Sequence, residues 1–140
     1  MSTKVRDIMS RDVHVVRPDD SLQDAAMQMR SHDVGFLPVC DGEKLVGTLT
    51  DRDIAIQAVA EGKDPKKTRV KDLGNREVCW CYDDQSPEDA AKMMKDKEVR
   101  RVLVIDRDSK QLIGVVSVGD LAIKSSSKAS GSVMEKTGPK

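Results

Sequence analysis

Two short stretches of the chain place a carboxylate three positions after a hydroxyl residue. Thr50 precedes Asp53 and Ser117 precedes Asp120, each pair directly after an apolar stretch that we expect to form a strand, at residues 45–49 and 112–116. We expect each pair to begin a helix, and a helix start offers unpaired backbone N–H groups and the positive end of the helix dipole. Such a start suits a phosphate group, and the carboxylate could accept hydrogen bonds from two ribose hydroxyls. The pattern favours a nucleotide site.

The same spacing also defines a capping box, in which the two side chains satisfy backbone donors and need no ligand. The chain contains this spacing at four places: Ser21/Asp24, Thr50/Asp53, Ser86/Asp89 and Ser117/Asp120. On spacing alone, capping is the more frequent role. The glycine and apolar strand directly upstream distinguish the copies at Thr50 and Ser117. One residue can both cap a helix and bind a ligand.

Composition limits the class of protein. The 140 residues suffice for one domain with a real core. Lys plus Arg and Asp plus Glu number 24 each, so the charge balance argues against a general role on nucleic acid or an anionic membrane. The only aromatic residues are Phe36, Trp80 and Tyr82, too few for base-stacking platforms. Since no apolar run is long enough to span a membrane and the start lacks a signal peptide, we expect a cytoplasmic protein.

The cysteines and histidines do not form a clear reactive site. Cys40, Cys79 and Cys81 are an odd set, which argues against a disulfide framework. Cys79 and Cys81 would share one face of a strand, with His14 and Cys40 as conceivable co-ligands, but a single C-x-C is weak support for a metal site. We interpret the cysteines as small buried hydrophobic residues and predict no metal. Neither His14 nor His32 has a nucleophile partner, so we predict no catalytic residues and no enzyme.

A duplication organises residues 5–122. Val70 repeats Val5, and Ser86 repeats Ser21, at an offset of 65 residues; a longer hairpin turn in the second copy then pairs Gly114 with Gly47. We place the first repeat at 3–62, a linker at 63–69, the second repeat at 70–124 and a flexible tail at 125–140. Because one repeat buries too little alone, the two should pack with pseudo-twofold symmetry and form two equivalent crevices for small ligands.

Each repeat is expected to contain the order strand–helix–strand–strand–helix. In the first, we expect a strand at 13–16, a helix after Ser21, a hairpin at 36–49, and a helix from about Asp51 that Gly62 ends. The inner faces that periodicity predicts for the two helices are Leu22, Ala25, Ala26 and Met29, and Ile54, Ala55, Ala58 and Val59.

These elements and motifs resemble the CBS-domain pair, a family named after cystathionine β-synthase. The resemblance covers residues 3 to 124, and its most specific element is a glycine, a hydroxyl residue three positions later and an aspartate three positions after that. Gly47/Thr50/Asp53 and Gly114/Ser117/Asp120 match that motif in register. The stretch from Thr50 to Ile54 is also similar to small bacterial proteins that consist of little beyond the pair.

The resemblance implies a mixed α/β (α+β) fold of two tandem β-α-β-β-α repeats with pseudo-twofold symmetry, commonly assembled as a disc-like homodimer. It also implies a non-catalytic regulatory module that senses AMP, ADP or ATP, or in some relatives NAD or S-adenosylmethionine. Since such a module acts through another state or partner, we expect self-association or an effector protein. The alternative is a structural or interaction module in which the hydroxyl/carboxylate pairs only cap helices.

Site residues follow from the same resemblance. Asp53 and Asp120 would bind ribose hydroxyls. The residues expected to hold phosphate or ribose are Thr50, Ser117, Arg52, Arg100 and Arg101. Those expected around the adenine, largely through backbone groups, are Val15, Val16, Arg17, Pro38, Val39, Trp80 and Cys81. The arginines could instead solvate an exposed strand end. Gly119 in place of Arg52, and Leu103 in place of Pro38, indicate that the two sites differ.

Overall fold

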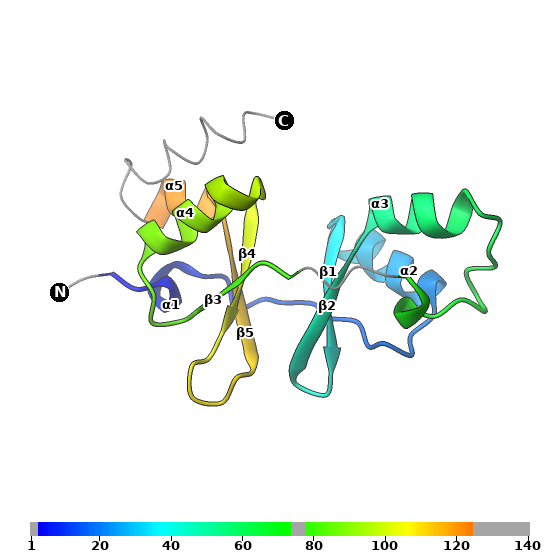
Figure 1. Ribbon diagram of the computed structural model, residues 1–140, viewed down its shortest axis with the longest axis horizontal. Helices are drawn as coiled ribbons and strands as arrows, with labels where there is room; N and C mark the ends of the chain where they lie inside the picture. The colour runs from blue at the N-terminus through cyan, green and yellow to red at the C-terminus, as the bar shows by residue number, and fades with distance from the viewer. Residues whose placement is uncertain (1–2, 74–77, 125–140) are drawn as a thin grey trace. The chain divides into compact units, whose positions relative to one another are not determined.

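The computed structural model describes residues 3–73 and 78–124 and has the predicted mixed α/β architecture (Figure 1). The described residues form two compact units. The α2 unit comprises residues 14–73 and 78, and the α4 unit comprises residues 3–13 and 79–124.

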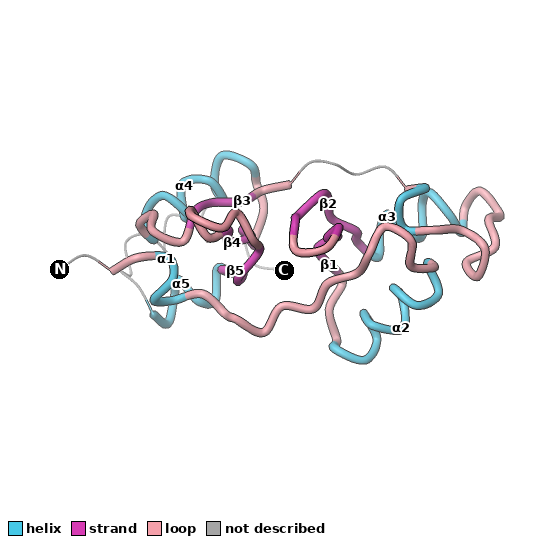
Figure 2. Tube along the Cα trace, turned by 90° about the horizontal axis from the view of Figure 1, so that it is seen from below, coloured by secondary structure: helices cyan, strands magenta, loops and turns pink. Residues whose placement is uncertain are grey.

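In the α2 unit, two antiparallel strands carry helices on one face (Figures 1 and 2). The strands are β1 (Phe36–Asp41) and β2 (Lys44–Thr50), joined by a turn in which Gly42 has φ 64°. The helices are α2 (Leu22–His32) and α3 (Asp51–Ile54), which continues as a π-helical turn (Ala55–Val59); a 3-10 turn (Val70–Asp72) follows. The expected strand at 13–16 is reduced to one parallel bridge, between Val16 and Val39.

The α4 unit repeats this plan with a sheet in the order β3-β4-β5. β3 (Trp80–Tyr82) runs parallel to β4 (Arg101–Ile105), which pairs antiparallel with β5 (Leu112–Ser117). The bridge Cys81↔Val104 corresponds to Val16↔Val39 at the offset of 65. Helices α1 (Val5–Ile8), α4 (Pro87–Lys97) and α5 (Val118–Lys124) cover one face of the sheet (Figures 1 and 2).

Two predicted helix faces need correction. Leu22, Ala25 and Met29 are buried as expected, but Ala26 is exposed. After α3, Ala58 is buried whereas Ala55 is exposed and Val59 has 71% of its surface exposed. For Val59 the cause is the π-helical turn that begins at Ala55, whose wider winding moves this side chain off the position that a period of 3.6 residues predicts. Gly62 ends the segment as expected, with φ 71°.

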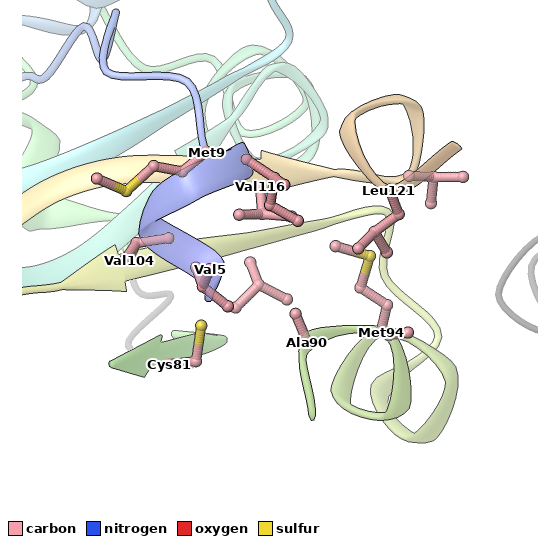
Figure 3. Packing of buried hydrophobic residues seen from close by; sticks show 12 residues of the cluster. Val5, Met9, Cys81, Ala90, Met94, Val104, Val116 and Leu121 are labelled. Carbon is pink, nitrogen blue, oxygen red and sulfur yellow. The ribbon is translucent and has the colours of Figure 1, made fainter. Parts of the chain in front are cut away.

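The hydrophobic core of each unit is completed by a short segment from the other sequence repeat. We call residues 3–13 the N-terminal lead segment and residues 68–73 the internal lead segment. The N-terminal lead segment begins the first repeat, yet Val5 and Ile8 are buried in the core of the α4 unit, where Val5 lies beside Cys81, Ala90 and Val104 (Figure 3). The internal lead segment leads into the second repeat, whose first residues include Val70 and Leu73, yet both side chains are buried in the core of the α2 unit.

Matching backbone hydrogen bonds hold the two lead segments. Val5 N–H donates to Gln85 O (2.8 Å) and Arg6 N–H to Asp83 O (3.0 Å). At the offset of 65, Val70 N–H donates to Asp20 O (2.9 Å) and Lys71 N–H to Pro18 O (3.0 Å). The compact units therefore do not coincide with the sequence repeats 3–62 and 70–124.

The cysteines are core residues rather than reactive thiols. Cys40 and Cys81 are buried, as predicted, Cys79 is half-buried, and all three are free. Burial raises the pKa of each thiol, and that of Cys81 rises to about 12 from 9.0. Since the thiolate is the reactive form, these side chains are poor nucleophiles at neutral pH.

The lead segment explains one motif glycine. The N-terminal lead segment adds Ser10 to β5 through a bridge to Val115. A Cβ on Gly114 would lie 2.5 Å from Met9 Sδ and 2.9 Å from the backbone oxygen of Ser10. Only glycine allows this close approach without a shift of the backbone.

We therefore expect Gly114→Ala to lower the free energy of unfolding by about 1–3 kcal/mol, the usual cost of overpacking. The measurement is urea unfolding followed by circular dichroism. Gly119→Ala is the matched control, because a Cβ there meets nothing closer than Ser117 Oγ at 3.5 Å. That control should be neutral or stabilising by up to about 1 kcal/mol. Equal stability of the two variants would contradict the packing account.

Thiol labelling tests the burial of Cys81. A pKa of about 12 instead of 9.0 leaves roughly a thousandth of the usual thiolate at pH 8, so Cys81 should react correspondingly slowly with a disulfide reagent. The folded state keeps this thiol protonated; its contribution to stability is complete below pH 9.0 and is lost as the pH rises toward about 12. Peptide mapping of the labelled protein gives each rate, with the guanidinium-unfolded chain as reference. Labelling of folded Cys81 at the unfolded rate would refute this account.

Candidate functional site

The start of α3 is closed by its own side chains. Thr50 N–H donates to Asp53 Oδ2 (2.9 Å), and Asp53 N–H donates to Thr50 Oγ1 (3.0 Å). Both residues are half-buried. The pair is thus a complete capping box, which holds the last residue of β2 and the first turn of the helix in a fixed geometry.

The start of α5 has the same arrangement. Ser117 N–H donates to Asp120 Oδ2 (2.9 Å), and Asp120 N–H donates to Ser117 Oγ (3.1 Å). The box at Ser86 and Asp89 is also complete, and Ser21 Oγ accepts from Asp24 N–H at 3.1 Å. The capping box is therefore confirmed at three of the four places, and at Ser21 the hydroxyl caps the helix by a single bond.

Capping uses only part of the hydrogen-bond acceptor capacity of the Asp53 and Asp120 carboxylates. In each box, the capping bond to the carboxylate uses Oδ2. A carboxylate has two oxygens with about four acceptor positions, so each can cap a helix and still accept from a ligand hydroxyl. The capping bonds fix the rotamer of each Asp, which pre-organises that side chain.

Basic residues gather at the start of α5. Arg101 lies opposite Ser117 in the register of β4 and β5, and Arg100 O accepts from Val118 N–H at 3.1 Å. The Arg101 side chain is exposed and that of Arg100 is half-buried. Two guanidinium groups therefore belong to residues that adjoin Ser117 and the first turn of α5, and guanidinium groups are well suited to bind phosphate.

The start of α3 differs in charge. Phe36 takes the place of Arg101 opposite Thr50, and Asp51 N–H donates to Gly35 O (2.9 Å). A Cβ on Gly35 would lie 2.7 Å from Asp51 Oδ2, so this carboxylate crowds the position where the other unit has Arg100. Arg52 is exposed in the first turn. The two helix starts share their capping geometry but not their electrostatics.

The residues expected around adenine divide into core and surface. The side chains of Val16 and Cys81 are 0% and 1% exposed, and Pro38 and Val39 are also buried. Such residues offer a ligand mainly backbone groups, and Val16 N–H already donates to Pro38 O at 3.0 Å. The exposed members of the set are Val15, Arg17 and Trp80.

A cluster beside Trp80 was not predicted. The Tyr82 ring meets that of Trp80 edge-on with centroids 5.0 Å apart, and Arg107 Cζ lies 4.1 Å from the centre of the Tyr82 ring. Arg107 also donates to both oxygens of Asp84, and this contact holds the pKa of Asp84 below its usual value. The residues come from β3 and the β4–β5 turn, more than 20 positions apart, so no local pattern signals their contact.

The side chains of the two histidines are in contact, which the sequence did not indicate. The rings of His14 and His32 stack at 3.5 Å between centroids and 9° between planes. Lone pairs in nearly parallel ring planes do not converge on one ion. Across residues 3–73 and 78–124, no group of three or more His, Cys, Asp or Glu side chains could hold a metal.

Comparison with known proteins identifies the repeats. The CBS domain family model matches residues 5–58 and 70–126. Among relatives, CBS domain-containing protein YhcV of Bacillus subtilis is 37% identical over 128 residues, which cover 91% of this chain and 89% of that protein. Hypoxic response protein 1 of Mycobacterium tuberculosis is 38% identical over 121 residues, covering 86% of this chain and 83% of that protein.

Solved structures agree with this assignment. A crystal structure of Hypoxic Response Protein I with two coordinated zinc ions has a TM-score of 0.77 at 37% identity and covers 87% of this chain and 98% of that one. The CBS-domain pair of protein MJ0100, in complex with 5′-methylthioadenosine and S-adenosyl-L-methionine, has a TM-score of 0.71 at 29% identity, covering 86% and 97%. None of the helices described here is long and apolar enough to cross a membrane. The chain belongs to the CBS-domain family, as a tandem pair of the kind that forms regulatory modules.

Proposed function

We propose that the chain is a non-catalytic regulatory module that binds an adenine nucleotide at the starts of α3 and α5. AMP is the smallest ligand with all the groups that these sites would recognise, and ADP or ATP would extend it. One observation carries the proposal: two capping boxes, at Thr50/Asp53 and Ser117/Asp120, occupy equivalent helix starts in a CBS-domain pair. Asp53 and Asp120 accept from ribose hydroxyls.

The start of α5 is the better phosphate site. Arg100 and Arg101 adjoin Ser117 there, whereas Asp51 crowds the corresponding position at α3. A guanidinium favours a phosphate through charge-assisted hydrogen bonds, and a carboxylate opposes it. Arg52 supplies one cation at α3. We infer that a phosphorylated ligand binds more tightly at α5.

A solved relative supports an adenosine-containing ligand. The MJ0100 pair holds two adenosine derivatives that lack phosphate. Adenine recognition in this chain would use backbone groups around Val15–Arg17 and Trp80–Asp83, because Val16 and Cys81 bury their side chains. S-adenosylmethionine and NAD therefore belong in any panel of ligands. The output passes through self-association or an effector protein.

A second candidate is a structural or interaction module without a nucleotide. The observation that favours it is that all four hydroxyl/carboxylate pairs cap helices, including Ser21 and Ser86, which lie outside the candidate site. Capping alone accounts for the spacing. In the nucleotide-binding module Asp120 caps α5 and also contacts the ribose, whereas in the structural module it only caps its helix, as Asp89 does.

A thermal-shift panel of AMP, ADP, ATP, NAD and S-adenosylmethionine separates them. A ligand at 100 times its Kd should stabilise the wild-type chain by about 2.7 kcal/mol. Asp120→Ala and Asp53→Ala should weaken that stabilisation because each removes a ribose acceptor.

Asp89→Ala is the matched control, since it breaks the same capping box away from the candidate site. Each of the three variants should lose about 1 kcal/mol of stability without ligand, but Asp89→Ala should keep the full response to ligand. An equal response in all three variants would disprove the ribose assignment. No shift with any of the five ligands would favour the structural module.

We also propose that two copies associate through the face that carries the π-helical turn. Ile56 and Val59 are 49% and 71% exposed on this turn. Large apolar side chains grouped on one turn favour a covering partner, and the resemblance to CBS pairs points to a second copy.

Sedimentation tests the dimer. Val59→Lys places a charge on the proposed contact and should convert a dimer into a monomer at micromolar concentration. Val46→Lys is the control, because Val46 is 39% exposed on β2 and lies outside the turn. A wild-type monomer, or a Val59→Lys chain that sediments like wild type, would contradict this interface.

A further inference from the structure

The side chain of Asp83 joins three segments of the α4 unit. It is only 8% exposed, although it directly follows the edge strand β3. Oδ2 accepts from Arg6 Nη1 at 3.3 Å and Oδ1 accepts from Arg107 N–H at 3.1 Å. Because Asp83 O also accepts from Arg6 N–H at 3.0 Å, this residue binds the N-terminal lead segment twice. We call this set of contacts the Asp83 junction.

Among its described residues, the α2 unit lacks such a junction. Pro18 occupies the position equivalent to Asp83 and accepts only through its backbone, from Lys71 N–H at 3.0 Å. Side-chain ties there run to Asp19: Arg69 Nη1 donates to Asp19 O at 2.6 Å, and Lys71 pairs with Asp19 at 2.8 Å through side chains that are 57% and 80% exposed. An exposed pair of this kind contributes little stability. The chain thus fastens its N-terminal lead segment differently from its internal one.

The junction also adjoins the stretch proposed to contact adenine. Trp80–Tyr82 form β3, and Asp83 N–H continues the ladder by donating to Ile105 O at 3.0 Å. The lead segment that Asp83 holds runs on through residues 11–13 into the α2 unit, which begins at His14. A shift of β3 would therefore move Asp83 and, through Arg6, the segment that leads to the α2 unit.

We propose that a ligand bound at Trp80–Asp83 fastens the N-terminal lead segment, with Asp83 as the positioning residue that couples the two. The proposal rests on the proposed function and specifies how that site is regulated. The docked segment holds the Asp83 backbone through Arg6, so the ligand binds the docked state more tightly than the released state. A ligand can shift the docking equilibrium only through this difference in affinity. Ligand release then loosens residues 3–10, and the freed segment is the signal.

Hydrogen exchange with AMP as the probe tests the coupling. Calorimetry first gives the Kd, and exchange is then measured without AMP and at 100 times Kd. The reporters are the amides of Val5, Arg6 and Ser10, which bond to Gln85 O, Asp83 O and Val115 O. If release of the segment abolishes binding, their exchange should slow by up to about 100-fold. The Ala90 amide in α4, which bonds to Ser86 O, is the reference in the same unit and should slow much less.

Arg6→Gln removes the guanidinium, while Asp83 retains the Arg107 N–H as a partner, so the fold should persist. In this variant the slowing caused by AMP should fall several-fold. Lys71→Gln, which breaks the exposed tie of the internal lead segment, is the matched control and should respond like wild type.

The possible results of this experiment separate the coupling from the proposed function. Binding heat with unchanged exchange at Val5, Arg6 and Ser10 would overturn the coupling and leave the proposed function intact. Equal slowing at Ala90, or equal responses of Arg6→Gln and Lys71→Gln, would likewise overturn it. No binding heat from AMP would overturn AMP binding itself and this proposal with it.

Discussion

Each hydrophobic core of this protein is closed by a short segment from the start of the other repeat. Val5 and Ile8 are buried in the α4 unit, and Val70 and Leu73 in the α2 unit. Full burial of one such aliphatic side chain contributes roughly 1.5–3 kcal/mol, a large share of the marginal stability of a small domain. Neither repeat can therefore close its own core from its own residues. The duplication in the sequence is a physical requirement, because each copy supplies what the other needs.

The same exchange links the site to the rest of the chain. The strand ends that carry Thr50 and Ser117 are positioned by sheets, and those sheets pack on cores that the lead segments complete. Capping boxes then fix the carboxylates of Asp53 and Asp120. The cap and the proposed ligand contact use one side chain, so the site is preorganised at no additional conformational cost. At the two helix starts the capping geometry is shared, and the difference lies in charge.

Features governed by local rules could be predicted from the sequence. The hairpins, the capping boxes and the left-handed Gly62 each depend on neighbouring residues. The repeat was visible because matching residues keep a nearly constant offset. The family and the mixed α/β fold followed from these features, and the comparisons confirm both.

Features governed by distant partners could not be predicted. The repeat pairs Val5 with Val70 and so predicts that both are buried. It does not predict which of the two cores contains each side chain. The π-helical turn moves Val59 to the surface although its spacing indicated burial. Asp83 gives no signal in the sequence, since Arg6 and Arg107 lie 77 and 24 positions away. His14 and His32 likewise meet only through the fold.

The central claim is that the carboxylates that cap α3 and α5 also hold a ribose. A crystal structure of the full chain grown with AMP tests this claim most directly. The account predicts ribose hydroxyls within hydrogen-bond distance of Asp120, with phosphate near Ser117 and Arg101 and the capping bonds retained. Bound AMP elsewhere on the chain, or Asp120 bonded to its own helix start with no ligand beside it, would contradict the account.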